Sequence, residues 1–132
     1  MGIKRKQTSL LTKEIVTEQL LQQHLRGWKS NPKFIVENLY VFGWESDMLI
    51  MTRSGYWYEL ECKISFTDFK NDFTHKWQKH ELLKNGDEKH RRPNYFYYCV
   101  PWYLSGKVLP LLPDYAGLIV LTENGRLNEV KR

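Results

Sequence analysis

The sequence has few cysteines and no long hydrophobic run. Cys62 and Cys99 are the only cysteines among 132 residues, and they do not form a Cys-x-x-Cys pair. Two thiols do not make the disulfide framework of a small secreted domain. Residues 1–14 lack the apolar core of a signal peptide, and no apolar stretch is long enough to cross a bilayer. We therefore expect a cytoplasmic protein with reduced thiols and no membrane partner.

Internal repeats, low-complexity tracts and zinc-ligand spacing are also lacking. Of the four histidines, His75 and His80 are the closest pair with a helical setting. Their separation places them on different sides of a helix, and no cysteine pair supports them as ligands. The sequence therefore disfavours a zinc site.

Aromatic and aliphatic residues are plentiful. Hydrophobic residues make up 42% of the chain, with 5 Trp, 8 Tyr and 6 Phe. This content is enough for a packed core and argues against wholesale disorder. The length fits one domain. We expect a basic arm at residues 1–9 and a single domain at residues 10–132.

Charge is distributed unevenly along the chain. Residues 1–33 hold seven Lys or Arg against two acids, whereas residues 34–61 hold five acids against one Arg. A basic exterior suits a polyanionic partner such as DNA. Acids concentrated within a basic chain need a separate reason, and a bound cation is one.

The apolar spacing and turn signals predict helices packed on a mixed sheet, in the order α-β-β-β-α-β-(α)-β-β. The helices are expected at residues 10–26, from Ser65 to a polar loop at 84–94, and as a short element within 101–115. The strands are expected at residues 34–42, 46–52, 56–64, 95–100, 116–121 and 127–131. This order is an α/β architecture in which helices flank the sheet.

Two of the predicted helices contain residues that favour a helix start or packing on the sheet. Thr8, Ser9 or Thr12 is expected to cap the first helix. Ser65, followed by Asp68, resembles a capping box at the start of the second. The second helix carries a stripe of aromatic residues that should pack on the sheet: Phe66, Phe69, Phe73 and Trp77. Asp72 and Lys76 continue its polar side at helical spacing, which is compatible with a simple i,i+4 ion pair or with a supporting role near a bound cation.

The second and third strands bring acids together. A turn at 53–55 makes strand 46–52 antiparallel to strand 56–64, so Asp47 and Glu61 should be near cross-strand neighbours. Like charges directly opposite destabilise a sheet, unless a cation lies between them. The pair therefore fits a hard divalent ion with oxygen ligands, Mg²⁺ or Mn²⁺. The alternative is an ordinary surface salt bridge.

Lys63 follows Glu61 on the same face of the strand. Its ammonium would orient or deprotonate a metal-bound water, or stabilise charge on a phosphate. Together with the metal, Asp47, Glu61 and Lys63 suit hydrolysis of a phosphodiester. Glu45 and Glu59 share these faces and are secondary candidates, with Glu45 as a further ligand and Glu59 flanking the site.

An acid, a hairpin turn and then Glu-x-Lys resemble the signature of the PD-(D/E)XK nuclease superfamily, with Ser46 in place of the proline. The flanks resemble its MmcB-like branch from bacteria and phages. The matching segments are ESDMLIMTRSGYWYELECKISFTDFKND (45–72), YFYYCVPWYL (95–104) and LPDYAGLIVLTENGRLNEV (112–130).

This resemblance implies a restriction-endonuclease-like core and a metal-dependent deoxyribonuclease linked to DNA repair or phage DNA metabolism. The superfamily often adds a glutamate from the first helix, and Glu14 and Glu18 are the candidates here. Both are equally compatible with solvated helix residues. The alternative function is a nucleic-acid-binding module that keeps the nuclease fold without turnover.

Basic residues outside the hairpin are candidates for phosphate contacts. They are Lys4, Arg5, Lys6, Lys89, Arg91 and Arg92. The last three belong to a loop that is equally compatible with simple solvation. The chain is short for a nuclease that spans a duplex, so a homodimer or a partner protein is compatible with this length.

Overall fold

The computed structural model describes residues 10–40, 42–86 and 92–132. They form one mixed sheet with strands in the order β1-β2-β3-β4-β5-β6. β3, β4 and β5 are parallel, and the pairs β1–β2, β2–β3 and β5–β6 are antiparallel. The strands are β1 (Phe34–Tyr40), β2 (Glu45–Met51), β3 (Trp57–Cys62), β4 (Tyr95–Pro101), β5 (Ala116–Leu121) and β6 (Leu127–Lys131).

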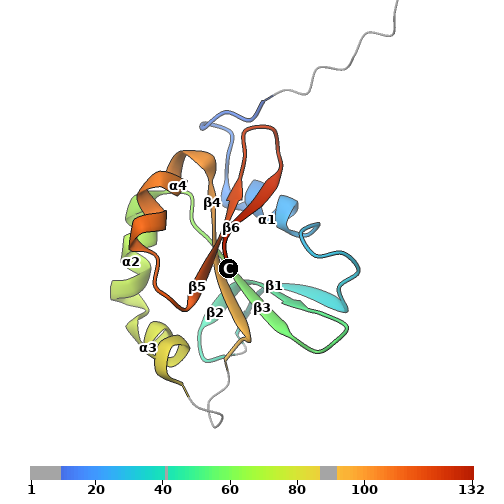
Figure 1. Ribbon diagram of the computed structural model, residues 1–132, viewed down its shortest axis with the longest axis vertical. Helices are drawn as coiled ribbons and strands as arrows, with labels where there is room; N and C mark the ends of the chain where they lie inside the picture. The colour runs from blue at the N-terminus through green and yellow to red at the C-terminus, as the bar shows by residue number, and fades with distance from the viewer. Residues whose placement is uncertain (1–9, 41, 87–91) are drawn as a thin grey trace, which may run out of the picture.

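Helices cover both faces of this sheet (Figure 1). The helices are α1 (Glu18–Leu25), α2 (Phe66–His75), α3 (Trp77–Asn85), α4 (Trp102–Val108) and the 3₁₀ turn η1 (Leu109–Leu111). Leu21 and Leu25 of α1 close one core, which also buries Met48, Leu60 and Cys62. A second core lies between the sheet and the helices α2, α3 and α4 on the opposite face.

The mixed α/β sheet flanked by helices is confirmed. The region between β3 and β4 differs from the sequence prediction, because it holds two helices and not one. Lys76 adopts φ −123° and ψ 40°, outside the helical region, and separates α2 from α3. Trp77 is consequently 62% exposed and does not extend the aromatic stripe onto the sheet.

The first helix begins later than expected. The structure caps it with Thr17, whose hydroxyl accepts a hydrogen bond from the backbone N–H of Leu20. The preceding segment is bound elsewhere, since the N–H of Leu11 donates to the carbonyl of Glu123 at 2.7 Å. The helix prediction over residues 10–17 was therefore wrong.

Local chemistry explains the hairpin that carries the acids. Gly55 has φ +94°, a conformation that favours glycine, and the Thr52 hydroxyl accepts a hydrogen bond from the N–H of Tyr56. The resulting register pairs Met48 with Leu60 and Leu49 with Glu59. The hairpin and the Ser65 cap of α2 are confirmed.

Cys62 and Cys99 are buried free thiols. Among the helices within the described ranges, none is long and apolar enough to cross a membrane.

Candidate functional site

Asp47 and Glu61 lie side by side across the β2–β3 hairpin. The register that pairs Met48 with Leu60 places them opposite each other at the end away from the turn. The backbone N–H of Cys62 donates to Oδ2 of Asp47 at 2.8 Å. Burial, together with the neighbouring carboxylate of Glu61, raises the pKa of Asp47 to about 8. These are the two carboxylates that the sequence predicts to be neighbours.

The two oxygens of Glu61 differ sharply. Oε1 accepts hydrogen bonds from the ammonium groups of Lys76 at 3.1 Å and Lys79 at 3.0 Å. Oε2 is buried, and among the described residues no group with a permanent donor reaches it. The neighbouring Asp47 carboxyl is able to donate to it only when protonated. One edge of the carboxylate is thus neutralised by lysines, while the other faces a second acid.

Electrostatics keep Glu61 ionised despite its position. Burial raises the pKa of this carboxyl, but the Lys79 ammonium and the contact with Asp47 outweigh burial and lower it overall. In the absence of another cation, the proton of the pair therefore resides on Asp47.

Asp72 is the centre of the surrounding charge network. Its carboxylate lies 3.4 Å from the ammonium of Lys63 and 3.0 Å from that of Lys79. The imidazole of His80 lies 2.7 Å away, and the Tyr98 hydroxyl donates to the same carboxylate. Burial raises the pKa of Asp72, but the His80 hydrogen bond and these ammonium charges hold it well below its usual range.

The predicted i,i+4 ion pair between Asp72 and Lys76 is confirmed. The two groups are within 3.7 Å, but Asp72 is buried, with 3% of its surface exposed. Its spacing from Phe69 is three residues, which places it beside the apolar stripe of the helix. That spacing was the available signal for its burial.

Lys79 and His80 are members of the site that the sequence reasoning missed. Both are buried charged or polar residues on α3. Lys79 is seven residues after Asp72 and His80 is seven after Phe73, so both lie on the inward side of α2 continued across the break at Lys76. The break displaces Trp77 from the aromatic stripe.

Lys63 lies at the edge of the same cluster, with 14% of its side chain exposed. Its positive charge opposes the rise in the pKa of Asp47. The structure therefore brings Asp47, Glu61 and Lys63 together, with Asp72 holding the ammonium of Lys63.

Glu59 and Glu45 occupy different surroundings. Glu59 is buried, and the indole N–H of Trp44 lies 2.8 Å from Oε2 and 3.1 Å from Oε1 of its carboxylate. Burial raises the pKa of Glu59 to about 7, against the opposing charge of Lys79. Glu45 is exposed and makes no ion pair within the described residues. Neither touches the free oxygen of Glu61.

The structure does not bring Glu14 or Glu18 to the acidic pair. Both are exposed, and α1 packs on the opposite face of the sheet. Gln22 is the residue of α1 that reaches toward β2, where its amide lies 3.5 Å from the carbonyl oxygen of Asp47. Within the described ranges, no group of three or more Asp, Glu, His or Cys residues is arranged to hold a metal ion.

The predicted phosphate-binding residues lie mostly outside the described residues. These are Lys4, Arg5, Lys6, Lys89 and Arg91. Arg92 is described, and its guanidinium lies 3.3 Å from the carbonyl oxygens of Leu82 and Leu83 at the end of α3. Its observed position therefore closes a helix end.

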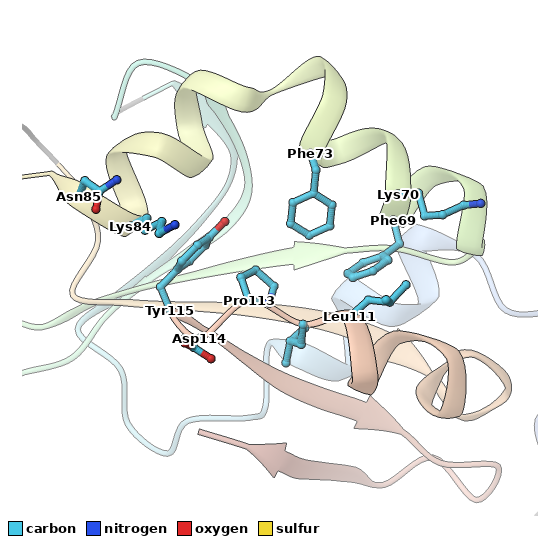
Figure 2. Close-up of a pocket in the computed structure, with 10 residues that line it drawn as sticks. Phe69, Lys70, Phe73, Lys84, Asn85, Leu111, Pro113, Asp114 and Tyr115 are labelled. Atoms are coloured by element: carbon cyan, nitrogen blue, oxygen red, sulfur yellow. The ribbon is translucent and has the colours of Figure 1, made fainter.

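A cavity of ≈920 Å³ lies between α2, the end of α3 and the segment 111–115. Figure 2 shows the rings of Phe69, Phe73 and Tyr115 around this space, with the end of Lys70 directed away from it. His80 separates the cavity from the acidic pair, because its ring bonds Tyr115 on one side and Asp72 on the other. Asp47 and Glu61 do not line it.

The chain matches no protein-family model and no curated protein. Among solved structures, it is similar to the SPO1766 protein of unknown function from Silicibacter pomeroyi, with a TM-score of 0.63 and 21% identity. That match covers 89% of this chain and 72% of the other. An XisH family protein from Nostoc punctiforme PCC 73102 gives a TM-score of 0.44 at 13% identity, covering 80% of this chain and 90% of the other. The first similarity shows a shared fold alone.

Proposed function

We propose that this protein is a nuclease of the PD-(D/E)XK type that hydrolyses DNA phosphodiester bonds with Mg²⁺ or Mn²⁺. One observation carries the proposal: Asp47 lies beside Glu61, whose buried Oε2 has no permanent donor. Two adjacent carboxylates destabilise each other until a cation joins them.

The acidic pair fits a hard divalent ion. Mg²⁺ is commonly held by one or two carboxylates and completes its coordination with waters and substrate phosphates. Asp47 and Glu61 would hold the ion, so a third protein carboxylate is not required. When bound, the ion lowers the pKa of a coordinated water and neutralises charge on the phosphate.

The chain's own residues perform the remaining tasks. Lys63 would orient the attacking water or stabilise charge on a phosphate oxygen. Asp72 holds the Lys63 ammonium at 3.4 Å and so limits its freedom. Lys79 neutralises the other edge of Glu61, which keeps this carboxylate ionised while it is buried.

The restriction-endonuclease-like topology and the MmcB-like resemblance belong to the same proposal. The motif spacing and the mixed sheet with helices on both faces support them. A role in DNA repair or phage DNA metabolism follows from the resemblance.

The test is cleavage of plasmid, single-stranded and branched DNA with Mg²⁺ or Mn²⁺. Glu61→Gln removes the charge at constant size, and Lys63→Ala removes the ammonium. Exposed residues provide matched controls, Glu123→Gln and Lys84→Ala. We expect cleavage by the wild type and both controls, with loss in Glu61→Gln and Lys63→Ala. Equal cleavage by all five proteins would indicate a contaminant and refute the assignment.

A DNA-binding module without turnover is the second candidate. The observation in its favour is that Oε1 of Glu61 already contacts two ammonium groups. This alternative predicts salt-sensitive DNA binding, no cleavage and no thermal stabilisation by divalent ions. A rise in melting temperature with Mn²⁺ that disappears in Glu61→Gln would exclude it.

A further inference from the structure

A cavity of ≈440 Å³ opens beside the acidic pair, between the β1–β2 turn and α3. Its aromatic wall comes from Tyr40, Phe42 and Trp44, and its cationic wall comes from Lys76 and Lys79. His75, Gln78 and the exposed carboxylate of Glu45 also line it.

Both walls contact the carboxylates of the candidate site. The Trp44 indole donates to Glu59, and the Lys76 and Lys79 ammonium groups both donate to Oε1 of Glu61. A ligand in this cavity would therefore lie next to the acidic pair. The larger cavity of Figure 2 lacks this proximity.

Lys76 contacts Glu61 and Asp72, but its release leaves both acids paired with Lys79. Lys79 is 1% exposed and bridges Glu61 and Asp72, so Glu61 keeps a counter-ion without Lys76. The Lys76 side chain is 37% exposed and starts from the non-helical junction of α2 and α3. Its ammonium is able to turn from Glu61 toward an anion in the cavity while the buried network stays intact.

Tyr40 supplies a flat surface at the cavity edge. It ends β1 and is 71% exposed, although large aromatic rings usually bury much of their surface. Aromatic rings exposed beside cationic groups provide stacking platforms for unpaired bases. Bases within a duplex are stacked on each other and do not offer a face to such a ring.

We propose that this cavity binds one unpaired nucleotide of DNA next to the phosphate to be cleaved, with its base on Tyr40 and its phosphate on Lys76. The inference rests on the proposed nuclease function and names its substrate class as single-stranded, frayed or branched DNA. Lys76 acts as a positioning residue for the strand, and Tyr40 determines the preference for an unpaired base.

Fluorescence anisotropy in EDTA tests the inference without cleavage, using a labelled oligonucleotide of about 12 nucleotides and a blunt duplex of the same sequence. The wild type should bind the single strand more tightly. Tyr40→Ala should weaken that binding by roughly 5- to 150-fold, and Tyr40→Phe should restore it. Tyr56→Ala, at an exposed tyrosine of the β2–β3 turn, is the control and should bind as the wild type does.

Salt dependence tests the second contact. Lys76→Ala should reduce the slope of log affinity against log salt by about 0.7, the amount for one phosphate on a single strand. Lys76→Arg should restore the slope, and Lys84→Ala on the exposed side of α3 should leave a smaller change. Melting curves must show that each variant is folded.

The outcomes separate this inference from the nuclease proposal. Unchanged single-strand binding in folded Tyr40→Ala, or a preference for the duplex, overturns the nucleotide site even if Glu61→Gln abolishes cleavage. Tyr40-dependent binding without metal-dependent cleavage leaves the nucleotide site standing and refutes the nuclease. If the wild type binds no oligonucleotide, the nucleotide site fails, and metal-dependent cleavage alone decides the nuclease proposal.

Discussion

Replacing Asp47 with asparagine should stabilise the metal-free protein. The Asp47 carboxyl receives a hydrogen bond from the Cys62 N–H and faces the unpaired Oε2 of Glu61. An asparagine side chain has one acceptor for the first group and a permanent donor for the second. Asp47→Asn therefore supplies, without titration, the arrangement that the wild type reaches only by binding a proton.

The magnitude follows from the pKa. Holding a proton at pH 7 on a carboxyl with an ordinary pKa of 3.8 costs the folded state up to about 4 kcal/mol. The variant avoids this cost, so we expect a gain of about 1–4 kcal/mol in the free energy of unfolding. For a domain of this size, that gain corresponds to a rise of roughly 4–15 °C in melting temperature.

The assay is thermal unfolding in EDTA at pH 5 and pH 7, followed by titration with Mn²⁺. The gain should be smaller at pH 5, because protonating an ordinary carboxyl is easier there. Mn²⁺ should stabilise the wild type but not Asp47→Asn. Asp114→Asn, at an exposed acid, should change the stability by less than about 0.5 kcal/mol.

A lower melting temperature for metal-free Asp47→Asn at pH 7 would refute the proposed repulsion within the pair. Equal stabilisation of both proteins by Mn²⁺ would place the metal elsewhere.

Three further outcomes follow from buried groups. Without metal, the folded pKa values of Asp47 and Glu59 are about 8 and 7, against unfolded values of 3.8 and 4.5. The folded state thus holds more protons between these values, and urea unfolding should show stability falling as pH rises from about 4 to 8. In the same urea assay, Asp72→Ala should lower the free energy of unfolding by about 3–5 kcal/mol, because it leaves the buried Lys79 ammonium with fewer partners. An unchanged urea midpoint would contradict a stabilising role for this charge network. Gly117→Ala should lower the free energy of unfolding by about 1–3 kcal/mol in calorimetry, since an added Cβ would lie 2.4 Å from the Tyr97 ring. In the control Gly106→Ala, the added Cβ meets open space and should not destabilise the protein.

The parts of the site predictable from the sequence are those that depend on local geometry. Alternation along residues 58–65 and a glycine-containing turn are enough to pair the two strands, and counting outward from the turn places Asp47 beside Glu61. The capping hydroxyl of Ser65 similarly predicts the start of α2. These features involve residues within a few positions of a turn or a helix end.

The counter-ions were not predictable in the same way. Lys79 and His80 lie at helical spacing from Asp72 and Phe73, but a charged side chain is buried only with a partner, and the partner Glu61 of Lys79 lies on β3. The burial of Glu59 depends on Trp44, which reaches it from the β1–β2 turn. Both contacts are tertiary, so periodicity within one element carries no signal for them.

The burial of both faces of β3 is another feature that its alternating sequence does not predict. Glu59 and Glu61 alternate with Leu60 and Cys62, a pattern typical of a strand with one solvated face. The structure buries all four, because helices cover both sides of the sheet. The alternation reflects two chemically different interiors, one apolar and one that combines apolar and aromatic residues with buried charges.

The charged residues of the site come from three different elements, so the site is complete only when all three have packed together. Glu61 belongs to β3 and Asp72 to α2, whereas Lys79 comes from α3. A chain that has formed the hairpin and α2, but has not yet docked α3, presents the acids without their principal buried counter-ion. The acids of the site are therefore neutralised by Lys79 only when α3 has docked on the sheet.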